Sequence, residues 1–600
     1  MSLNAPLAKL FKTAAAVMEI KGEPVFKAIA FQRISRMLED DVFDAQKSVD
    51  TAWAEPVAGV GKSSQKIIEA FVETGVSTDL DELIASVPAG LLDLMRIPSL
   101  GPKTISLLWR ERGITGVGEL AAAIDSGRLD GLKGIGAKKI ESLKEGLAIL
   151  ATAGDRKGLV DALAIGQDML DAVRKLPGVL RAEVGGSLRR WQETVGDIDL
   201  IATVKDVNPK DVSGAAASAA PKITEAFTKL PAVTKILGQG DTKASVLTTA
   251  GLQVDLRVVP DANFGATLQY FTGNKDHNKR LRGRAIDMGF TLNEWGLYDA
   301  KAYDKAEKET GHAPKLKPIA SKNEADVYRA LGLDYIPPEL RQDRDEIERA
   351  AAGTLPNLIT VEDIRGDLHT HTVASDGTGT IEEMAAAAKA AGYAYLGITD
   401  HSKSQVIAHG LSAADLIKHV AAIRKIGEKL KGIRLFAGCE VDILADGRLD
   451  YEDAVLAELD YVVASPHLAL KQDSQKATDR LLRAIDNRYV TIVGHPTGRL
   501  IGGRTGLTPD FAKVFARAAA AGVAMEINAG WPRLDLSDLN ARAALAAGVK
   551  LSINTDAHSP QDFVQLALGV AVARRAGAEA DDVVNCLTGP EMVEFLERKR

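Results

Sequence analysis

The sequence predicts a chain of several domains: an all-α N-terminal region, an α+β middle region and a C-terminal α/β barrel. Its 600 residues exceed what one hydrophobic core usually organises. Amphipathic helical runs fill the first 150 residues, and strands and helices mix from 151 to 335. From residue 365 onward, short apolar runs alternate with helical stretches, which is the pattern of parallel βα units.

Composition narrows the class of protein. With 46% hydrophobic and 26% charged residues, the chain resembles an ordinary globular protein. Its two cysteines, Cys439 and Cys586, cannot form a disulfide framework, and their spacing does not indicate a zinc site. Neither a signal peptide nor a membrane-spanning stretch is evident, so we expect a cytoplasmic protein. A net charge of −7 argues against a uniformly basic nucleic-acid binder but allows a local basic surface.

Three near-repeats lie in the helical region, at 57–71, 97–111 and 132–146. Each has a turn of small residues followed by a helix that opens with lysine. Glycine lets backbone N–H groups approach a phosphate closely, and a helix N-terminus favours the anion. A plain helix–helix turn would explain one repeat, but three in succession favour helix-hairpin-helix binding to the DNA backbone, without sequence readout. The candidates in these turns are Gly59, Gly61, Lys62, Gly101, Lys103, Gly134, Gly136 and Lys138.

Two strand-like stretches of the middle region carry aspartates. In 183–202, the period of two places Asp197 and Asp199 on one face of a strand, and in 252–259 it places Asp255 on one face. Carboxylates side by side repel each other and resist burial unless a cation neutralises them. A solvated strand face would explain one pair, but three carboxylates from two strands favour a two-metal site for phosphoryl transfer.

Phosphate-binding groups accompany these aspartates. Gly186 and Ser187 offer a backbone amide and a hydroxyl, and Arg190 offers a planar fork for phosphate oxygens. Farther along, five cations in ten residues suit a phosphate track, although such a run is more often a solvated helix face. These cations are Lys275, Lys279, Arg280, Arg282 and Arg284.

Residues 1–335 resemble family X DNA polymerases. The motifs that carry this resemblance are "GGSLRRWQETVGDIDL", "VDLRVVP" and "YFTGNKDHNKRLRGRAIDMGFTLNEW", which are similar to the family's nucleotidyltransferase palm and thumb. The resemblance implies that Asp197, Asp199 and Asp255 bind two catalytic Mg²⁺ or Mn²⁺ ions, with Asp255 accepting the proton of the primer 3′-hydroxyl. It further implies a dNTP site, with the triphosphate on Gly186, Ser187 and Arg190, the sugar on Tyr270, Phe271 and Gly273, and the base near Asn278. Arg282 would reach the DNA minor groove.

Three positions depart from the family pattern. Asn274 replaces the usual serine, and Trp191 is bulky where the family often has a short residue; neither is a metal ligand. The N-terminal segment resembles the family's small lyase domain, whose nucleophilic lysine position is occupied by Ile67, with Lys66 as the neighbouring alternative. The sequence leaves lyase activity open.

The strongest pattern lies after residue 365, where apolar runs end in residues that bind metals. Successive sites lie 27 to 39 residues apart, the length of a βα unit, and strand C-termini converge on one face of a βα barrel. Nine ligands are too many for one ion, and mixed imidazole and carboxylate ligation suits Mn²⁺, Zn²⁺ or Fe²⁺. The predicted ligands are His369, His371, Asp376, His401, Glu440, His467, His495, Asp556 and His558. His409 and His419 fall outside this pattern, and we expect them to be surface or packing residues.

Residues 365–600 resemble the PHP (polymerase and histidinol phosphatase) domain, a distorted (β/α)7 barrel with a trinuclear metal centre. Beside a family X core, this looks like bacterial and archaeal-type PolX. That resemblance implies a DNA repair polymerase with metal-dependent 3′–5′ exonuclease activity and, in some members, abasic-site (AP) endonuclease activity. It implies gapped or nicked DNA, 3′ ends and dNTPs as partners, and we expect a monomer.

The expected boundaries follow from these motifs. They are 1–80 (lyase-like), 81–150 (helix-hairpin-helix), 151–262 (palm), 263–335 (thumb), 336–364 (linker) and 365–600 (PHP barrel). Two alternatives stay open: a PHP-type phosphatase for small molecules, and a DNA-end-binding scaffold, each with an inactive polymerase core. The intact set of aspartates and the three hairpins oppose the phosphatase. A scaffold with degenerate sites would have lost ligand residues, and the sequence shows no such loss.

Overall fold

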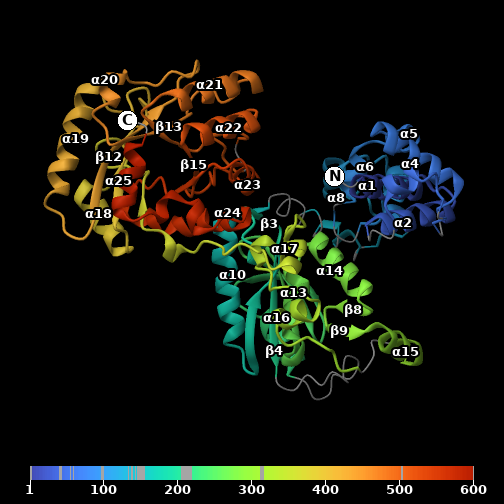
Figure 1. Cartoon of the computed structure of the whole chain (residues 1–600). Coiled ribbons are helices and arrows are strands. Elements are labelled where there is room, and N and C mark those ends of the chain that lie inside the picture. Colours follow the sequence, from blue (N-terminus) through green and yellow to red (C-terminus); the bar gives the residue numbers. More distant parts are fainter. Residues whose placement is uncertain are drawn as a thin grey trace. The chain divides into compact units, whose positions relative to one another are not determined.

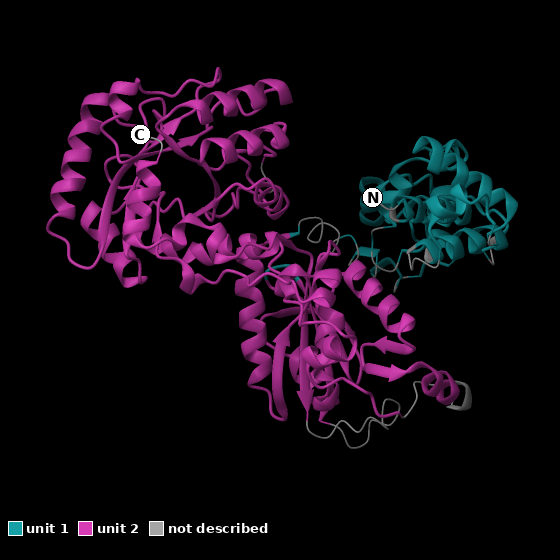
Figure 2. Cartoon of the chain, in the orientation of Figure 1, with its two compact units in different colours: residues 1–156, 250–252 teal, residues 157–249, 253–600 magenta. Residues whose placement is uncertain are grey.

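The computed structural model describes two compact units (Figure 2). Unit 1 comprises residues 1–156 with 250–252, and unit 2 comprises 157–249 with 253–600. The description covers residues 3–598 except 40–42, 55, 58–59, 96, 98–99, 133, 137–138, 142, 145–146, 148–155, 205–218, 311–315 and 502–503. Among the described residues, no helix is both long enough and apolar enough to span a membrane.

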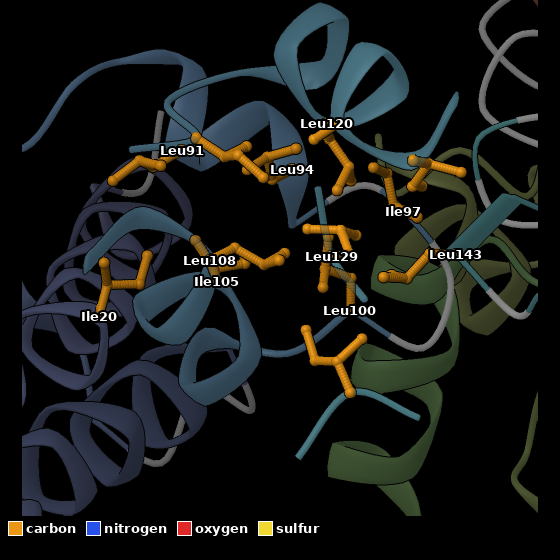
Figure 3. Packing of buried hydrophobic residues seen from close by; sticks show 14 of the residues in the cluster. Ile20, Leu91, Leu94, Ile97, Leu100, Ile105, Leu108, Leu120, Leu129 and Leu143 are labelled. Atoms are coloured by element: carbon orange, nitrogen blue, oxygen red, sulfur yellow. The ribbon is translucent and has the colours of Figure 1, made fainter. Parts of the chain in front are cut away.

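Unit 1 is helical, as the sequence predicts. It has two hydrophobic clusters, one that includes Leu7, Phe11 and Ile68, and a second around Leu108 and Leu120. Figure 3 shows the second cluster, in which leucines and isoleucines of several short helices converge. The helices are α1 (Asn4–Lys21), α2 (Val25–Glu39), α3 (Ala45–Asp50), α4 (Lys62–Thr74), α5 (Thr78–Ala85), α6 (Gly90–Leu94), α7 (Pro102–Arg112) and α8 (Val117–Asp125).

Unit 2 begins with a five-stranded sheet in the order β2-β4-β7-β6-β5. Only β4 and β7 run parallel, and they lie side by side at the centre of the sheet. Alternating apolar residues of both strands are buried, which explains why these stretches form strands. The elements of this region are β1 (Lys157–Gly158), α10 (Leu159–Arg174), β2 (Val179–Val184), α11 (Gly186–Arg189), β3 (Thr194–Val195), β4 (Asp197–Val204), α12 (Ala220–Thr228), β5 (Val233–Gln239), β6 (Lys243–Thr248) and β7 (Gln253–Pro260).

The segment 261–364 follows the sheet and has its own hydrophobic cluster, from Ala266 to Leu358. The stretch 336–364, expected to be a linker, is folded: it contains a helix and gives Ile336, Ile347 and Leu358 to this cluster. The elements are η2 (Asp261–Asn263), α13 (Phe264–Thr272), α14 (Lys275–Asp287), β8 (Phe290–Asn293), β9 (Gly296–Asp299), α15 (Ala300–Thr310), α16 (Glu324–Ala330), η3 (Pro338–Leu340), α17 (Glu346–Ala352) and η4 (Val361–Asp363).

The C-terminal part is a seven-stranded parallel sheet in chain order, β10 to β16. A bridge between Thr370 and Ala557, just beyond the ends of the first and last strands, brings the two edges together, so the sheet is a nearly closed barrel. This confirms the predicted α/β barrel. The strands are β10 (Gly366–Asp367), β11 (Tyr395–Ile398), β12 (Arg434–Asp442), β13 (Tyr461–Ser465), β14 (Val490–Val493), β15 (Ala524–Asn528) and β16 (Leu551–Asn554).

Helices surround these strands (Figure 1). Because both faces of the barrel strands are covered, six of the seven strands are buried at every residue, rather than at every second residue. The helices are α18 (Ile381–Ala390), α19 (Ala413–Gly427), α20 (Asp453–Leu456), α21 (Ser474–Asp486), α22 (Phe511–Ala521), α23 (Asp538–Ala546), η5 (Pro560–Gln565), α24 (Leu566–Ala576), η6 (Ala580–Asp582), η7 (Val584–Cys586) and α25 (Gly589–Glu597).

Candidate active sites

The three aspartates of the five-stranded sheet lie together. Asp199 and Asp255 are directly opposite each other on the parallel strands β4 and β7, and Asp197 precedes Asp199 on the same face. Burial, followed by the charges of Asp197 and Asp255, raises the pKa of Asp199 to about 7. A carboxyl group that holds its proton so strongly marks a place where a cation would be bound favourably.

The turn that follows β2 packs closely against Asp199. The backbone N–H of Gly185 donates to the Asp199 carbonyl at 2.8 Å. Gly186 has φ +63°, and a Cβ there would lie 2.5 Å from Asp199 Oδ2, so both backbone conformation and space require glycine. Ser187, half-buried, follows in the short helix α11.

The Arg190 side chain contacts the segment around Thr272 and Gly273, at the C-terminal end of α13. Its guanidinium donates to the Thr272 carbonyl, and Gly273 approaches it so closely that a Cβ would lie 3.2 Å from Nη1. The structure therefore brings Gly186, Ser187, Arg190 and Gly273 to one side of the sheet, next to the aspartates.

Three residues expected to bind the nucleoside contact one another: Tyr270, Phe271 and Asn278. The two rings meet edge to face with centroids 5.2 Å apart, and Asn278 Nδ2 donates to the Tyr270 carbonyl at 2.7 Å. The unusual Asn274 caps α14, because its side chain accepts a hydrogen bond from the His277 backbone at 2.8 Å. The departure at this position thus has a local structural role.

The run of five cations on α14 is only partly available to a partner. Arg280 pairs with Asp343 and Glu348, and Arg284 Nε donates to the Leu331 carbonyl at 2.7 Å. These two side chains therefore have partners within the protein, and a phosphate would have to compete with those partners. Arg282 makes no hydrogen bond or ion pair with the residues that the structure describes.

The hairpins of unit 1 share one geometry. In each, an apolar residue between small residues is buried, and its N–H closes a turn by donating three residues back at 2.9–3.1 Å. In the first two hairpins, the next helix begins directly after a glycine. The buried residues are Val60, Leu100 and Ile135, and the glycines that follow them are Gly61, Gly101 and Gly136.

Within the described part of the chain, nothing near these following glycines excludes a larger side chain. Gly61 and Gly101 have negative φ, and a Cβ added at either, or at Gly136, would meet nothing within 4 Å. Only Gly134, with φ +92°, needs glycine for its conformation. Lys62 and Lys103 are exposed, while Gly59 and Lys138 lie outside the described residues. Space is thus left beside the turns for an external group.

The position expected for the lyase nucleophile is unsuitable for one. Ile67 is buried in the first hydrophobic cluster of unit 1, and Lys66 is exposed on the same helix. The side chain at position 67 therefore belongs to the core of that cluster.

The barrel brings its nine predicted ligands to the strand C-termini. Glu440 is at the centre: its carboxylate oxygens lie 2.8 Å from His401 Nδ1, 2.8 Å from His495 Nε2 and 3.3 Å from His467 Nε2. Three groups that could hold a metal ion share these residues. They are His371, Asp376, His401 and His558; His369, His371 and Asp556; and His401, Glu440 and His467.

Buried polar atoms without hydrogen bonds converge on the same centre. His401 Nδ1 and Glu440 Oε2 are close, but their alignment is too poor for a hydrogen bond. Unsatisfied buried polar atoms are costly, and a cluster of them suggests ions. Among the described residues, those around the centre are His369 Nε2, His371 Nδ1, His401 Nδ1, Glu440 Oε2, His467 Nε2 and His495 Nδ1. The donor set therefore fits divalent metal.

The pKa values of the barrel histidines shift in opposite directions. Burial and the neighbouring imidazoles of His401 and His558 lower the pKa of His371 to about 4, so this ring is a neutral ligand at physiological pH. Despite burial, the carboxylates of Glu440 and Asp376 raise the pKa of His401 to about 10, and Asp376 and Asp556 raise that of His558 to about 9. Metal binding must therefore displace protons from these two rings.

Sequence reasoning missed the residues that hold the ligands in place. Glu526, fully buried on β15, lies 2.8 Å from His369 Nδ1 and accepts from the His495 backbone at 2.7 Å. Asp442 contacts His467 Nδ1. A charged residue inside an apolar strand was the available sign for Glu526. His409 is exposed and His419 lies 2.8 Å from the buried Asp400, which agrees with surface and packing roles.

Comparisons with known proteins agree with this architecture. A family model described as DNA polymerase beta thumb matches residues 267–342, and the PHP domain model matches 367–529. The DNA polymerase/3'-5' exonuclease PolX of Bacillus subtilis (strain 168) is 34% identical over 592 residues, which cover 98% of each chain. A probable phosphatase of Thermoanaerobacter sp. (strain X514) is 30% identical over 245 residues, 39% of this chain and 95% of that protein. The first similarity spans the entire set of domains, whereas the second spans less than half of the chain.

Proposed function

Because this chain belongs to the PolX family, which joins a family X DNA polymerase to a PHP domain, we propose that it fills short gaps in DNA and hydrolyses DNA 3′ ends at two separate metal sites. It is a DNA polymerase with 3′–5′ exonuclease activity, and divalent metal serves both reactions. DNA and dNTPs are its substrates. We propose that it acts in the cytoplasm.

We assign nucleotide addition to the five-stranded sheet, the palm. Asp197, Asp199 and Asp255 hold two Mg²⁺ or Mn²⁺ ions, which supply the positive charge that neutralises the triphosphate and favours ionisation of the primer 3′-hydroxyl. Asp255, on the central strand beside Asp199, accepts the proton of that hydroxyl. The closeness of three carboxylates around a partly buried Asp199 supports this role.

The turn at 186–190 and the α13–α14 region bind the incoming nucleotide in this proposal. Gly186 and Ser187 contact the triphosphate with backbone amide and hydroxyl, and Arg190 contacts its oxygens. The nucleoside lies against Tyr270, Phe271 and Gly273, with Asn278 at the base. Arg282, which has no partner among the described residues, is left for the DNA.

Hydrolysis belongs to the barrel. The nine barrel ligands, centred on Glu440, hold two or three ions of Mn²⁺, Zn²⁺ or Fe²⁺, whose chemistry is to activate water and neutralise phosphate charge. Glu526 and Asp442 orient His369 and His467. The same centre is our candidate for AP endonuclease activity. The hairpins of unit 1 bind the DNA backbone through Gly61, Gly101 and Gly136 with Lys62 and Lys103.

The parallel register that places Asp199 opposite Asp255 carries the polymerase assignment. We expect Asp255→Asn to abolish extension of a primer on a gapped duplex with dNTPs and Mg²⁺ or Mn²⁺, while hydrolysis of a labelled 3′ end persists. Asp171→Asn, on an exposed helix face of the same region, is the matched control. Extension at the wild-type rate by Asp255→Asn would refute the assignment.

A phosphatase for small phosphomonoesters is the second candidate, because probable phosphatases match part of the chain. It predicts that the barrel cleaves a free phosphomonoester faster than the terminal phosphodiester of a DNA strand. Comparing the two substrates in the Asp255→Asn background, where extension cannot mask 3′ hydrolysis, separates the two candidates.

A further inference from the structure

The triphosphate-binding turn of the palm is held by the barrel. Residues 191–193 continue directly from Arg190, and two arginines that lie more than 300 positions later in the chain contact them. Both partners belong to unit 2. We propose that Arg499 and Arg575 of the barrel are positioning residues of the polymerase site, acting through Glu193 and the Trp191 carbonyl to hold the nucleotide-binding turn in place.

The contact between Arg499 and Glu193 is bidentate. Arg499 Nη1 donates to Glu193 Oε2 at 3.1 Å, and Nη2 donates to Oε1 at 2.5 Å. The arginine side chain is 17% exposed and the glutamate 24%, so water screens the pair incompletely. Arg499 also donates to the Leu534 carbonyl, which fixes the guanidinium to the barrel. Because the Arg499 guanidinium contacts both Glu193 and the Leu534 carbonyl, it restricts the position of the Glu193 side chain.

Arg575 makes the second contact. Its guanidinium donates to the Trp191 carbonyl, and it lies 3.8 Å from both Glu193 and Asp538. The side chain is 1% exposed, so its charge is buried beside residue 191. A buried charge is stable only with its partners in place, and the arginine therefore favours one position of the Trp191 backbone.

The turn itself transmits this restraint over a few residues. Trp191 N–H donates to the Leu188 carbonyl at 3.0 Å, and Gln192 N–H donates to the Ser187 carbonyl at 3.1 Å. Glu193 in turn accepts from the Leu159 N–H at 3.1 Å. Because Ser187 and Arg190 lie within this hydrogen-bonded turn, displacement of residues 191–193 displaces the groups that we assign to the triphosphate.

This inference rests on the proposed nucleotide site, and steady-state extension kinetics on gapped DNA test both. We expect Arg499→Ala and Glu193→Ala each to raise the KM for dNTP about 3- to 30-fold, the range found for residues that couple sites, with a smaller change in kcat. Since each removes the same contact, the double variant should be no worse than either single one. Arg499→Lys should recover part of the loss, because it keeps the charge without the fork.

Three controls make the outcome decisive. Hydrolysis of a labelled 3′ end reports that the barrel is folded in each variant. Arg517→Ala, which removes an arginine–carboxylate pair on the barrel surface, should leave the KM unchanged. Arg190→Ala tests the nucleotide site itself. An unchanged KM in Arg499→Ala and Glu193→Ala with a raised KM in Arg190→Ala would overturn the positioning role alone. An unchanged KM in Arg190→Ala would overturn the nucleotide site.

Discussion

Removing the charge of Asp199 should stabilise the metal-free palm while it destroys the metal site. Asp199→Asn keeps the size of the side chain but cannot ionise. Each tenfold change in proton affinity is worth about 1.4 kcal/mol, so a pKa raised from 3.8 to about 7 corresponds to about 4 kcal/mol at full effect. Because Asp199 is only half-buried, solvent screening reduces this, and we expect about 2 kcal/mol.

The pH dependence has a defined sign. A carboxyl group whose pKa is raised on folding binds more protons in the folded than in the unfolded protein between pH 4 and about 7. Its contribution to the free energy of unfolding therefore falls as pH rises through that interval. The wild type and Asp199→Asn should be equally stable near pH 4, and at pH 8 the variant should be more stable by about 2 kcal/mol.

This difference can be measured locally by hydrogen exchange in peptides that cover β4 and β7, in the presence of a chelator and at several pH values. A local measurement is not affected by the unfolding transitions of the other domains. Millimolar Mg²⁺ should then reverse the order, protecting the wild type and leaving the variant unchanged. Asp171→Asn, on an exposed pair, provides a pH-independent control. A variant that is no more protected than the wild type at pH 8, or a difference that does not vary with pH, would show that the carboxylates do not repel one another as inferred.

Three further predictions concern the other sites. His401→Ala with His467→Ala should abolish degradation of a 3′-labelled strand in Mn²⁺ while primer extension on gapped DNA continues; wild-type degradation would exclude the barrel as the nuclease. Gly101→Val should weaken duplex binding severalfold, as measured by fluorescence anisotropy. The melting temperature should not change, because a Cβ at this position meets no other described atom of the protein within 4 Å. Unchanged affinity would show that DNA does not approach this turn. Lys62→Glu with Lys103→Glu should reduce the slope of log affinity against log salt by about 2 on every sequence, and an unchanged slope would contradict phosphate contacts.

Local periodicity in the sequence predicted which residues gather at the two candidate metal sites. The alternation around Asp197 and Asp199 fixes which face each side chain occupies, and the structure has the same alternation. The candidate barrel ligands could be predicted because most of them lie at or just after the end of an apolar run, and parallel strands bring such ends together. In both cases the pattern that identifies the residues spans only a few positions of the sequence. The fold then brings these short stretches together.

Residues that depend on distant partners were not predictable. Arg280 and Arg284 look like part of a phosphate track in the sequence, but their partners lie on segments about 50 to 70 residues away. Arg499 and Arg575 lie 306 and 384 positions from the palm residues they contact. No spacing rule connects positions so far apart, and an arginine on a loop or helix outside a barrel is usually a surface residue.

One loop of the barrel contacts both the candidate metal centre and the arginine that holds the palm. A substitution near this loop can therefore affect both activities, and the choice of position decides whether one activity can be removed alone. Asn528, at the end of β15, donates to Asp556 Oδ2 at 3.0 Å, and Arg533 Nε lies 3.6 Å from the same oxygen. The next residue, Leu534, accepts from Arg499, which holds Glu193 of the palm. A change at Asp556 is therefore expected to disturb a loop that also contacts Arg499, which we propose to position the nucleotide-binding turn. His401 and His467 follow β11 and β13, neither of which is a neighbour of β15 in the sheet, so we expect nuclease function to be removed there with less effect on nucleotide binding.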